Sequence, residues 1–112
     1  MTKIEREEKR REKLRTNEIV ENAERKARRS YEKEINRIIR RNLRYCSAEV
    51  LETSEYFILC SYSTQIACID KETKRGYDYL RLVYGYTATS AQHIAKFFSD
   101  YNAICTLRWV DV

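Results

Sequence analysis

Apolar residues recur every three or four positions along residues 17–42, which is the spacing of an amphipathic helix. Successive side chains on a helix are turned by about 100°, so this spacing gathers the apolar residues on one stripe. Either Thr16 or Asn17 caps the helix, or the charged run before them continues it towards the N-terminus. The stripe consists of Ile19, Val20, Ala23, Ala27, Tyr31, Ile35, Ile38 and Ile39. We therefore predict a long N-terminal helix.

The pattern changes after Asn42 to one that is typical of strands. Two segments are rich in strand-forming residues. In the two others, alternate residues fall into two sets, one for each face of a strand. A polar stretch that ends in Gly76 separates the second segment from the third and is typical of a hairpin connection. The four segments are 54–62, 64–70, 77–85 and 103–110. We expect the first three to form an antiparallel meander and the fourth to add a C-terminal strand to the same sheet.

A short amphipathic helix is predicted between the last two strands. Gly85 ends the preceding strand, and Thr89-Ser90-Ala91-Gln92 fits a capping box, in which the threonine and glutamine side chains satisfy free amides at the helix start. The helix is expected to run to about Tyr101. Its predicted buried residues are Ala91, Ile94, Ala95, Phe98 and Tyr101.

These elements together predict an α+β fold in two parts. Residues 1–45 form a charged, basic amphipathic helix, whose first 16 or so residues are either helical or frayed, and residues 46–112 form a small α+β domain. A core of that size is marginal by itself, and both faces of the predicted sheet carry apolar or aromatic residues. We expect the second half of the helix to cover one face, and a homodimer through the helix is the competing arrangement.

Positive charge is concentrated in the first part of the chain. Residues 1–45 hold 16 Lys and Arg against 9 Asp and Glu, a net charge of +7, whereas residues 46–112 hold 6 against 8, a net charge of −2. The N-terminal helix therefore suits an acidic partner, which is either a nucleic acid or an acidic protein surface, although a solvated helix face is also compatible with this composition. The candidate contacts away from the apolar stripe are Arg29, Lys33, Arg37, Arg40 and Arg44.

Tyrosines are clustered in the second part of the chain. Four of the nine tyrosines fall within residues 77–86. They either pack in the core as strand-forming residues or form an exposed aromatic face, together with Arg81, for a protein interface or for base stacking. On the second interpretation the contact residues are Tyr77, Tyr79 and Arg81.

The only histidine, His93, lies where the predicted strand meets the helix. A catalytic histidine needs a nucleophile and an orienting acid, but the nearest acid, Asp100, is almost two helical turns away, and a metal site needs further ligands. We expect a half-buried structural histidine in a non-enzymatic protein without metal or cofactor. Residues at this junction either form a ligand site, in which the start of the helix binds an anion, or have only a structural role there. They are Tyr86, Thr87, Thr89, Ser90 and His93.

The cysteines and the N-terminal segment predict a cytoplasmic protein. The four cysteines lie mostly among apolar residues at irregular spacings of 14, 8 and 37, and no CxxC is present. We interpret them as reduced core residues. The first 15 residues lack the apolar centre of a signal peptide, and no run of about 18 apolar residues is long enough to span a membrane. The cysteines are Cys46, Cys60, Cys68 and Cys105.

Two stretches, SYSTQIA (61–67) and YGYTATSAQHIAKFF (84–98), resemble an uncharacterised family of small proteins from bacteriophages and mobile elements of Gram-positive bacteria. In that family a Tyr-x-Thr-x-x-Ala stretch begins a strand, and a tyrosine, a Ser/Thr cluster and a histidine precede an apolar helix. Ala91-Gln92 departs from the Ser/Thr-Arg pair expected there. The matching positions are Tyr62, Thr64, Ala67, Tyr86, Thr87, Thr89, Ser90 and His93.

The resemblance implies a genetic context and no particular chemistry. Small proteins in that context are often anti-defence inhibitors, such as anti-CRISPR proteins, or nucleic-acid-binding regulators. We therefore expect a non-enzymatic protein in the cytoplasm of the bacterial host, which inhibits a host defence protein or nuclease complex by occupying its surface. The alternative is a DNA- or RNA-binding regulator that uses the basic helix. The same arginines suit both partners, so the sequence leaves the two open.

Overall fold

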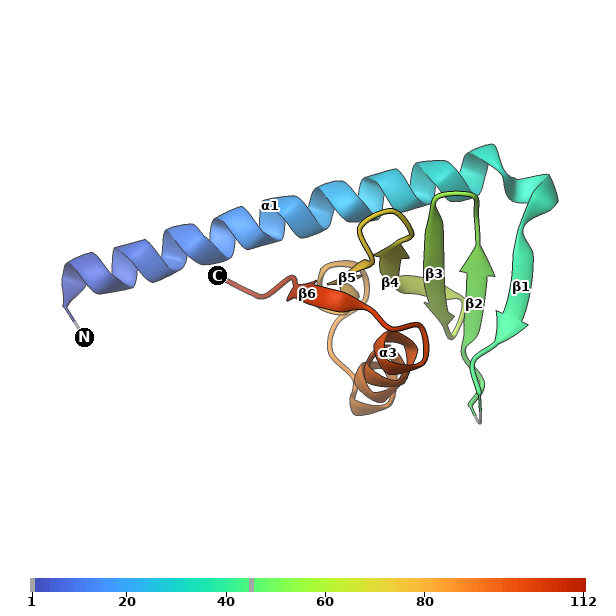
Figure 1. Cartoon of the computed structure of the whole chain (residues 1–112). Coiled ribbons are helices and arrows are strands. Elements are labelled where there is room, and N and C mark those ends of the chain that lie inside the picture. Colours follow the sequence, from blue (N-terminus) through green and yellow to red (C-terminus); the bar gives the residue numbers. More distant parts are fainter. Residues whose placement is uncertain (1, 45) are drawn as a thin grey trace.

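A six-stranded sheet lies between two helices in the computed structural model, which describes residues 2–44 and 46–112 (Figure 1). The elements in chain order are α1 (Lys3–Lys33), a 3-10 turn (Ile35–Arg37), β1 (Ile39–Asn42), β2 (Glu49–Glu52), β3 (Tyr56–Ser61), β4 (Thr64–Asp70), β5 (Arg75–Asp78), α2 (Leu80–Val83), α3 (Ala88–Asp100) and β6 (Ile104–Arg108).

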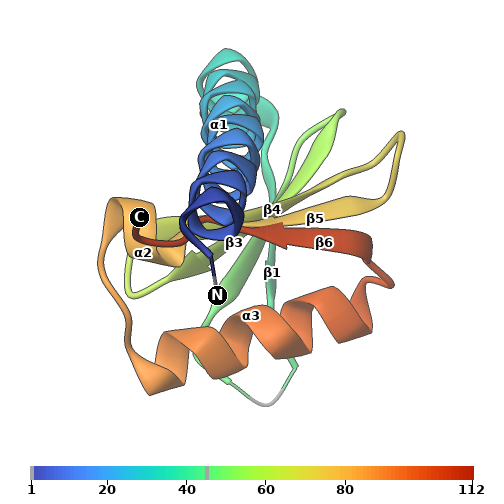
Figure 2. The ribbon, with the colours of Figure 1, turned by 90° about the vertical axis from the view of Figure 1, so that its left-hand side faces the viewer.

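The strands lie side by side in their order along the chain. β1 to β5 form an antiparallel meander, and β6 pairs in parallel with β5 after the chain has passed through α3. Figure 2 shows α1 and α3 on opposite faces of this sheet. The predicted α+β fold is confirmed, with a C-terminal strand in the same sheet, but the meander has five strands instead of three.

The charged N-terminal run belongs to α1. Thr2 caps the helix in a capping box with Glu5, in which the Glu5 amide donates to the threonine hydroxyl and the Glu5 carboxylate accepts from the Thr2 amide. Of the two predicted starts, continuation of the helix through the charged residues is therefore the one observed. Residues 2–15 are all exposed, and this part of α1 extends beyond the sheet (Figure 1).

α1 ends at Lys33, so the prediction of a helix up to residue 45 is wrong beyond this point. Residue 45 itself lies outside the described residues. Ile35 begins a 3-10 turn and Ile39 begins β1, although both continue the helical period of apolar positions. Isoleucine also suits strands, and the backbone of β1 pairs with β2.

The inner stripe of α1 packs on one face of the sheet. Val20 and Ala27 are fully buried against Ile58, Cys68 and Tyr79, so the sheet of the same chain covers this stripe. On the opposite face α3 packs on a second cluster, which also contains residues of β2 and α2. The buried members of this second cluster are Leu43, Ala48, Val50, Leu59, Ile66, Ala67, Ile69, Leu80, Ile94 and Phe97.

Residues 77–85 are not the single strand that their alternation predicted. β5 ends at Asp78, and a helical turn, α2, follows. The Asp78 carboxylate accepts a hydrogen bond from the Leu80 amide at 3.1 Å, which favours a turn at this point. Burial raises the pKa of Asp78. Gly85 then adopts φ +111°, a left-handed conformation that glycine takes without steric cost.

The helix α3 begins two residues earlier than predicted. Thr87 is its N-cap, and the Ser90 amide donates to the Thr87 hydroxyl at 3.2 Å, whereas Thr89 lies exposed within the helix. The buried face is turned by about one residue as well, because Phe97 is buried and Ala95 is exposed. The observed buried residues are Ser90, His93, Ile94 and Phe97.

All four cysteines carry free thiols in this structure. Cys68 is buried beneath α1, as expected of a core residue, and Cys46 and Cys60 are half-buried. Cys105 is exposed in β6, so the prediction of a core position is wrong for it. Across residues 2–44 and 46–112, no helix is long and apolar enough to cross a membrane.

The two threonines at the start of α3 provide a matched test of the cap. We expect Thr87→Ala to lower the free energy of unfolding by about 1 kcal/mol, because the Ser90 amide loses its acceptor. Thr89→Ala is expected to change stability by less than half of that, since Thr89 is exposed and alanine is a good helix former. Urea unfolding of both variants measures the difference. Equal losses, or a larger loss for Thr89→Ala, would contradict the assigned N-cap.

Candidate partner-binding surface

Five of the predicted contact residues lie at one end of the molecule. Arg29 and Lys33 are in the last turns of α1, Arg37 is in the 3-10 turn, Arg40 is in β1, and Arg44 follows that strand. Figure 1 shows that β1 is the outermost strand beside the C-terminal end of α1, so these elements are neighbours. All five residues are exposed, and Arg41 of β1 is an exposed sixth cation. We call the set Arg29, Lys33, Arg37, Arg40, Arg41 and Arg44 the cationic edge.

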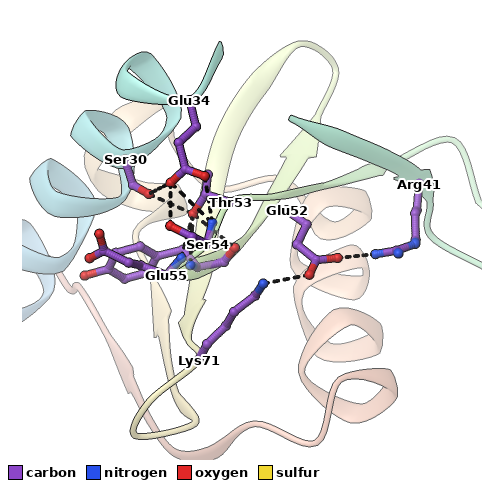
Figure 3. A network of polar contacts seen from close by, with 9 residues as sticks. Ser30, Glu34, Arg41, Glu52, Thr53, Ser54, Glu55 and Lys71 are labelled. Atoms are coloured by element: carbon purple, nitrogen blue, oxygen red, sulfur yellow. Dashed lines mark hydrogen bonds and ion pairs between the residues drawn. The ribbon is translucent and has the colours of Figure 1, made fainter. Parts of the chain in front are cut away.

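Hydrogen bonds to the turn between β2 and β3 fix the end of α1 (Figure 3). The Ser30 hydroxyl donates to Thr53 Oγ1 at 2.7 Å in a buried contact. The Glu34 carboxylate accepts from the Ser54 amide at 3.0 Å and from the Ser54 hydroxyl at 2.7 Å. The Ser54 hydroxyl is the main cause that lowers the pKa of Glu34, with the Ser54 amide and the positive charge of Arg37 acting in the same direction. These bonds hold the last turn of α1 against the sheet, so the cations on its outer side point into solvent.

The arginines of β1 lie beside acidic residues of β2. Arg40 Nη1 is 3.3 Å from Glu49 Oε2, and its Nη2 donates to the Tyr31 hydroxyl at 3.4 Å. Arg41 pairs with Glu52, which also binds Lys71 Nζ at 2.6 Å (Figure 3). The hydrogen bond from Lys71 is the main cause that lowers the pKa of Glu52. The two arginines are thus held in place by partners on β2.

Three of the other four cations of the cationic edge, Arg29, Lys33 and Arg37, differ from this pair. Among the described residues, no acidic side chain forms an ion pair with Arg29, Lys33 or Arg37. They are exposed and are thus the cations of this surface that are most accessible to an incoming partner.

Sequence reasoning missed Arg41 as a contact residue. A strand over residues 39–42 places Arg40 and Arg41 on opposite faces of the sheet but beside each other at its edge, so recognition of this strand would have added Arg41 to the candidates. The helical period of the isoleucines before it concealed the strand, and all four residues of β1 are exposed, so no apolar alternation marks it.

Tyr77, Tyr79 and Arg81 do not form the exposed face that one of the two interpretations predicted. Tyr79 is only 1% exposed and belongs to the core beneath α1, where burial raises its pKa well above the ordinary value. Tyr77 is half-buried in β5. Arg81 is exposed on α2, with its guanidinium 4.9 Å from the centre of the Tyr86 ring, and both line a groove of about 620 Å³ between α3 and β6. Tyr79 is therefore excluded as a partner contact.

The residues of the predicted junction lie partly in the core and partly on the surface. His93 is 8% exposed, more deeply buried than expected, and its Nδ1 lies 3.0 Å from the Ser61 hydroxyl. The Ser90 hydroxyl joins the same cluster at 3.3 Å from Ser61 Oγ. Tyr86 is exposed, as is Thr89, which was noted above. Ser90 and His93 thus connect α3 to β3 as a structural junction.

The chemistry of this cluster is limited by its burial. Ser61 is 2% exposed, so a substrate does not reach its hydroxyl, and no acid among the described residues contacts His93 to orient it. In the described part of the chain, no three His, Cys, Asp or Glu side chains are grouped so that they could hold a metal ion. The cluster satisfies polar groups in the core between β3 and α3.

Comparisons of the chain with protein-family models, with curated proteins and with solved structures found no match. The family resemblance described above therefore stays a prediction.

The contact between Glu34 and Ser54 makes stability depend on pH in a defined direction. The pKa of Glu34 in the folded state lies below its ordinary value of 4.5, so its stabilising contribution is complete above about pH 4.5 and is lost as the pH falls through the folded pKa. We expect Glu34→Gln to lower the melting temperature at pH 7, because a neutral amide accepts weaker hydrogen bonds than a carboxylate.

Thermal unfolding of parent and variant between pH 7 and pH 3 measures this effect. The gap in melting temperature is expected to narrow below about pH 4.5. Glu32→Gln, at an exposed position of the same helix, is the matched control and should show no such pH-dependent gap. A gap for Glu34→Gln that stays constant over the whole range would show that the carboxylate is not what holds the end of α1.

Proposed function

We propose that this chain is a non-enzymatic binding protein whose cationic edge engages the acidic surface of a partner protein. The supporting observation is that cations from three successive elements gather at one end of the fold. The nearby acids Glu34, Glu49 and Glu52 form hydrogen bonds or ion pairs within the chain. Glu32 and Glu55 are further exposed acids at this end, so six cations stand against five acids. The balance of charge is therefore slightly positive, which favours an acidic partner and a fast, steered association.

Exposed apolar residues within this surface favour a protein over a nucleic acid. Ile35 is 54% exposed and Ile39 is 48% exposed, and both lie among the arginines. A phosphate backbone gains nothing from contact with isoleucine, whereas protein interfaces combine an apolar centre with arginines. DNA or RNA binding by the same arginines remains the second candidate, and the experiment below separates the two.

The resemblance to small phage and mobile-element proteins suggests a class of partner protein. In that context we propose a host defence protein or nuclease complex in the bacterial cytoplasm, inhibited because the bound chain covers part of its surface. Occlusion of this kind requires no catalytic residue, cofactor or metal. It requires only a stable surface of matching charge, which the fixed end of α1 supports.

A pair of charge-matched variants tests the proposal. One variant carries Arg29→Gln, Lys33→Gln and Arg37→Gln in the cationic edge. The control carries Arg6→Gln, Lys9→Gln and Lys13→Gln in the exposed first half of α1, so it loses the same charge at the other end of the helix. Glutamine keeps the helix propensity of both segments, and circular dichroism checks that both variants are folded.

Each variant is used to capture proteins from the lysate of a Gram-positive bacterium, and the affinity for the captured protein is then measured. An exposed ion pair contributes roughly 0.2–1 kcal/mol, so loss of three should weaken binding about tenfold, with a smaller salt dependence. The control should bind like the parent. Equal binding by all three proteins would remove the cationic edge from the mechanism.

Binding to duplex DNA and to single-stranded RNA is measured in parallel at 50 and 200 mM salt. A direct nucleic-acid binder loses affinity steeply over that range, because phosphate contacts release counterions. Tight binding of this kind that disappears in the cationic-edge variant, with no captured protein, would replace the proposed partner by nucleic acid.

A further inference from the structure

The register of β1 shows which of its backbone groups face away from the sheet. Directly after β1, the amide of Leu43 donates to the carbonyl of Ala48 at 2.8 Å. This bond continues the register in which β1 pairs with β2. In an antiparallel pair, residues that bond to the partner strand alternate with residues whose N–H and C=O point away from it. Counted back from Leu43, the next residue whose backbone groups bond to β2 is Arg41. The outward residues are Arg40 and Asn42.

These outward backbone groups form an open edge. β1 is the terminal strand of the sheet, and no other described residue supplies a hydrogen-bond partner for the amide or carbonyl of Arg40 or Asn42. A row of unpaired backbone groups at a sheet edge is a template for another strand. The side chains of β1 are exposed throughout, so nothing within the described chain covers this edge.

The opposite edge of the sheet is less suited to such pairing. In β6, Cys105 adopts φ +50°, a left-handed conformation that interrupts the even spacing of backbone groups along the strand. The pairing of β5 with β6 also shifts register between Arg75 and Tyr77. β1 has no such interruption and is therefore the regular edge.

The charge of β1 selects its partner. Pairing of two copies through β1 would bring Arg40 and Arg41 of one chain beside the same residues of the other. Like charges on neighbouring strands are destabilising, and here the ion pairs with Glu49 and Glu52 offset part of that repulsion. An acidic strand would instead be attracted, because its carboxylates would lie next to Arg40 on one face of the sheet and next to Arg41 on the other. Arg37, which has no ion-pair partner among the described residues, is exposed two residues before β1 begins.

We propose that β1 accepts an extended acidic segment of the partner protein as an additional strand of the sheet. This inference rests on the proposed function and gives its binding mode. The backbone groups of Arg40 and Asn42 bond to the incoming strand, and the cations of the cationic edge attract its carboxylates.

Amide hydrogen exchange of the whole chain, followed by NMR, tests this mode. The probe is an end-blocked peptide of four alternating threonine and glutamate pairs, titrated to several millimolar, and the control peptide has lysine in place of glutamate. Without peptide, the amides of Arg40 and Asn42 should exchange fast, and that of Arg41 slowly. When nine-tenths of the protein is bound, exchange at Arg40 and Asn42 should slow about tenfold, because exchange then proceeds from the free fraction. The lysine peptide should have no effect.

A pair of variants at one position isolates the backbone contribution. Asn42→Pro removes the outward amide, and proline is tolerated on edge strands where that N–H faces solvent, so the variant should fold but bind the acidic peptide more weakly. Asn42→Ala keeps the amide and should bind like the parent. If Asn42→Pro fails to fold, the exchange pattern of the parent chain decides the question by itself.

The outcomes separate this inference from the proposed function. Peptide binding that shifts resonances of Arg29, Lys33 and Arg37 while exchange at Arg40 and Asn42 stays fast would overturn strand addition and leave the cationic edge as a binding surface. No binding of the acidic peptide at several millimolar would contradict both. Slow exchange at Arg40 and Asn42 without peptide, together with a dimer in solution, would replace the acidic partner by a second copy.

Discussion

The close packing of α1 against the sheet is the contact on which the rest of this structure depends. Small residues at Ala23 and Ala27 let the helix approach the strands, and Tyr79 fills the space beneath it. Without this cover the apolar face formed by Ile58 and Cys68 would be open to water. Because the end of α1 is also bound to the turn between β2 and β3, the position of the helix determines where its outer cations lie relative to β1.

The sequence predicted those elements that are buried in the core. The helices α1 and α3 were recognisable because one face of each is apolar and buried, and β3 and β4 because both of their faces are buried and their residues are strand-forming. β1 has no buried face, so its four residues carried no such signal and the isoleucines before it extended the helical period. Its existence depends on pairing with β2, a contact between segments that only the folded chain brings together. The turn at Asp78 was concealed in the same way, because Leu80 and Leu82 suit a strand and a helical turn equally.

The candidate surface was predictable in its charge but not in its geometry. Composition alone placed the cations in the first part of the chain, and the structure gathers five of the predicted ones at one end although they belong to different elements. The tyrosines show the limit of such reasoning. Tyr79 and Tyr86 belong to the same cluster of tyrosines in the sequence, yet Tyr79 is in the core beneath α1 and Tyr86 is exposed. Likewise, the choice of Thr87 over Thr89 as N-cap accompanies the docking of Ser90 and His93 on Ser61.

The rate at which Cys68 reacts with a thiol reagent tests the central contact most directly. Cys68 is fully buried under α1, and burial raises the pKa of its thiol. In a variant in which Cys46, Cys60 and Cys105 are replaced by alanine, we expect labelling at least about 10³-fold slower than in the unfolded chain, with a rate that follows global unfolding as urea is raised. Labelling within a few-fold of the unfolded rate, while circular dichroism still reports the folded protein, would show that α1 leaves the sheet readily and would contradict this account.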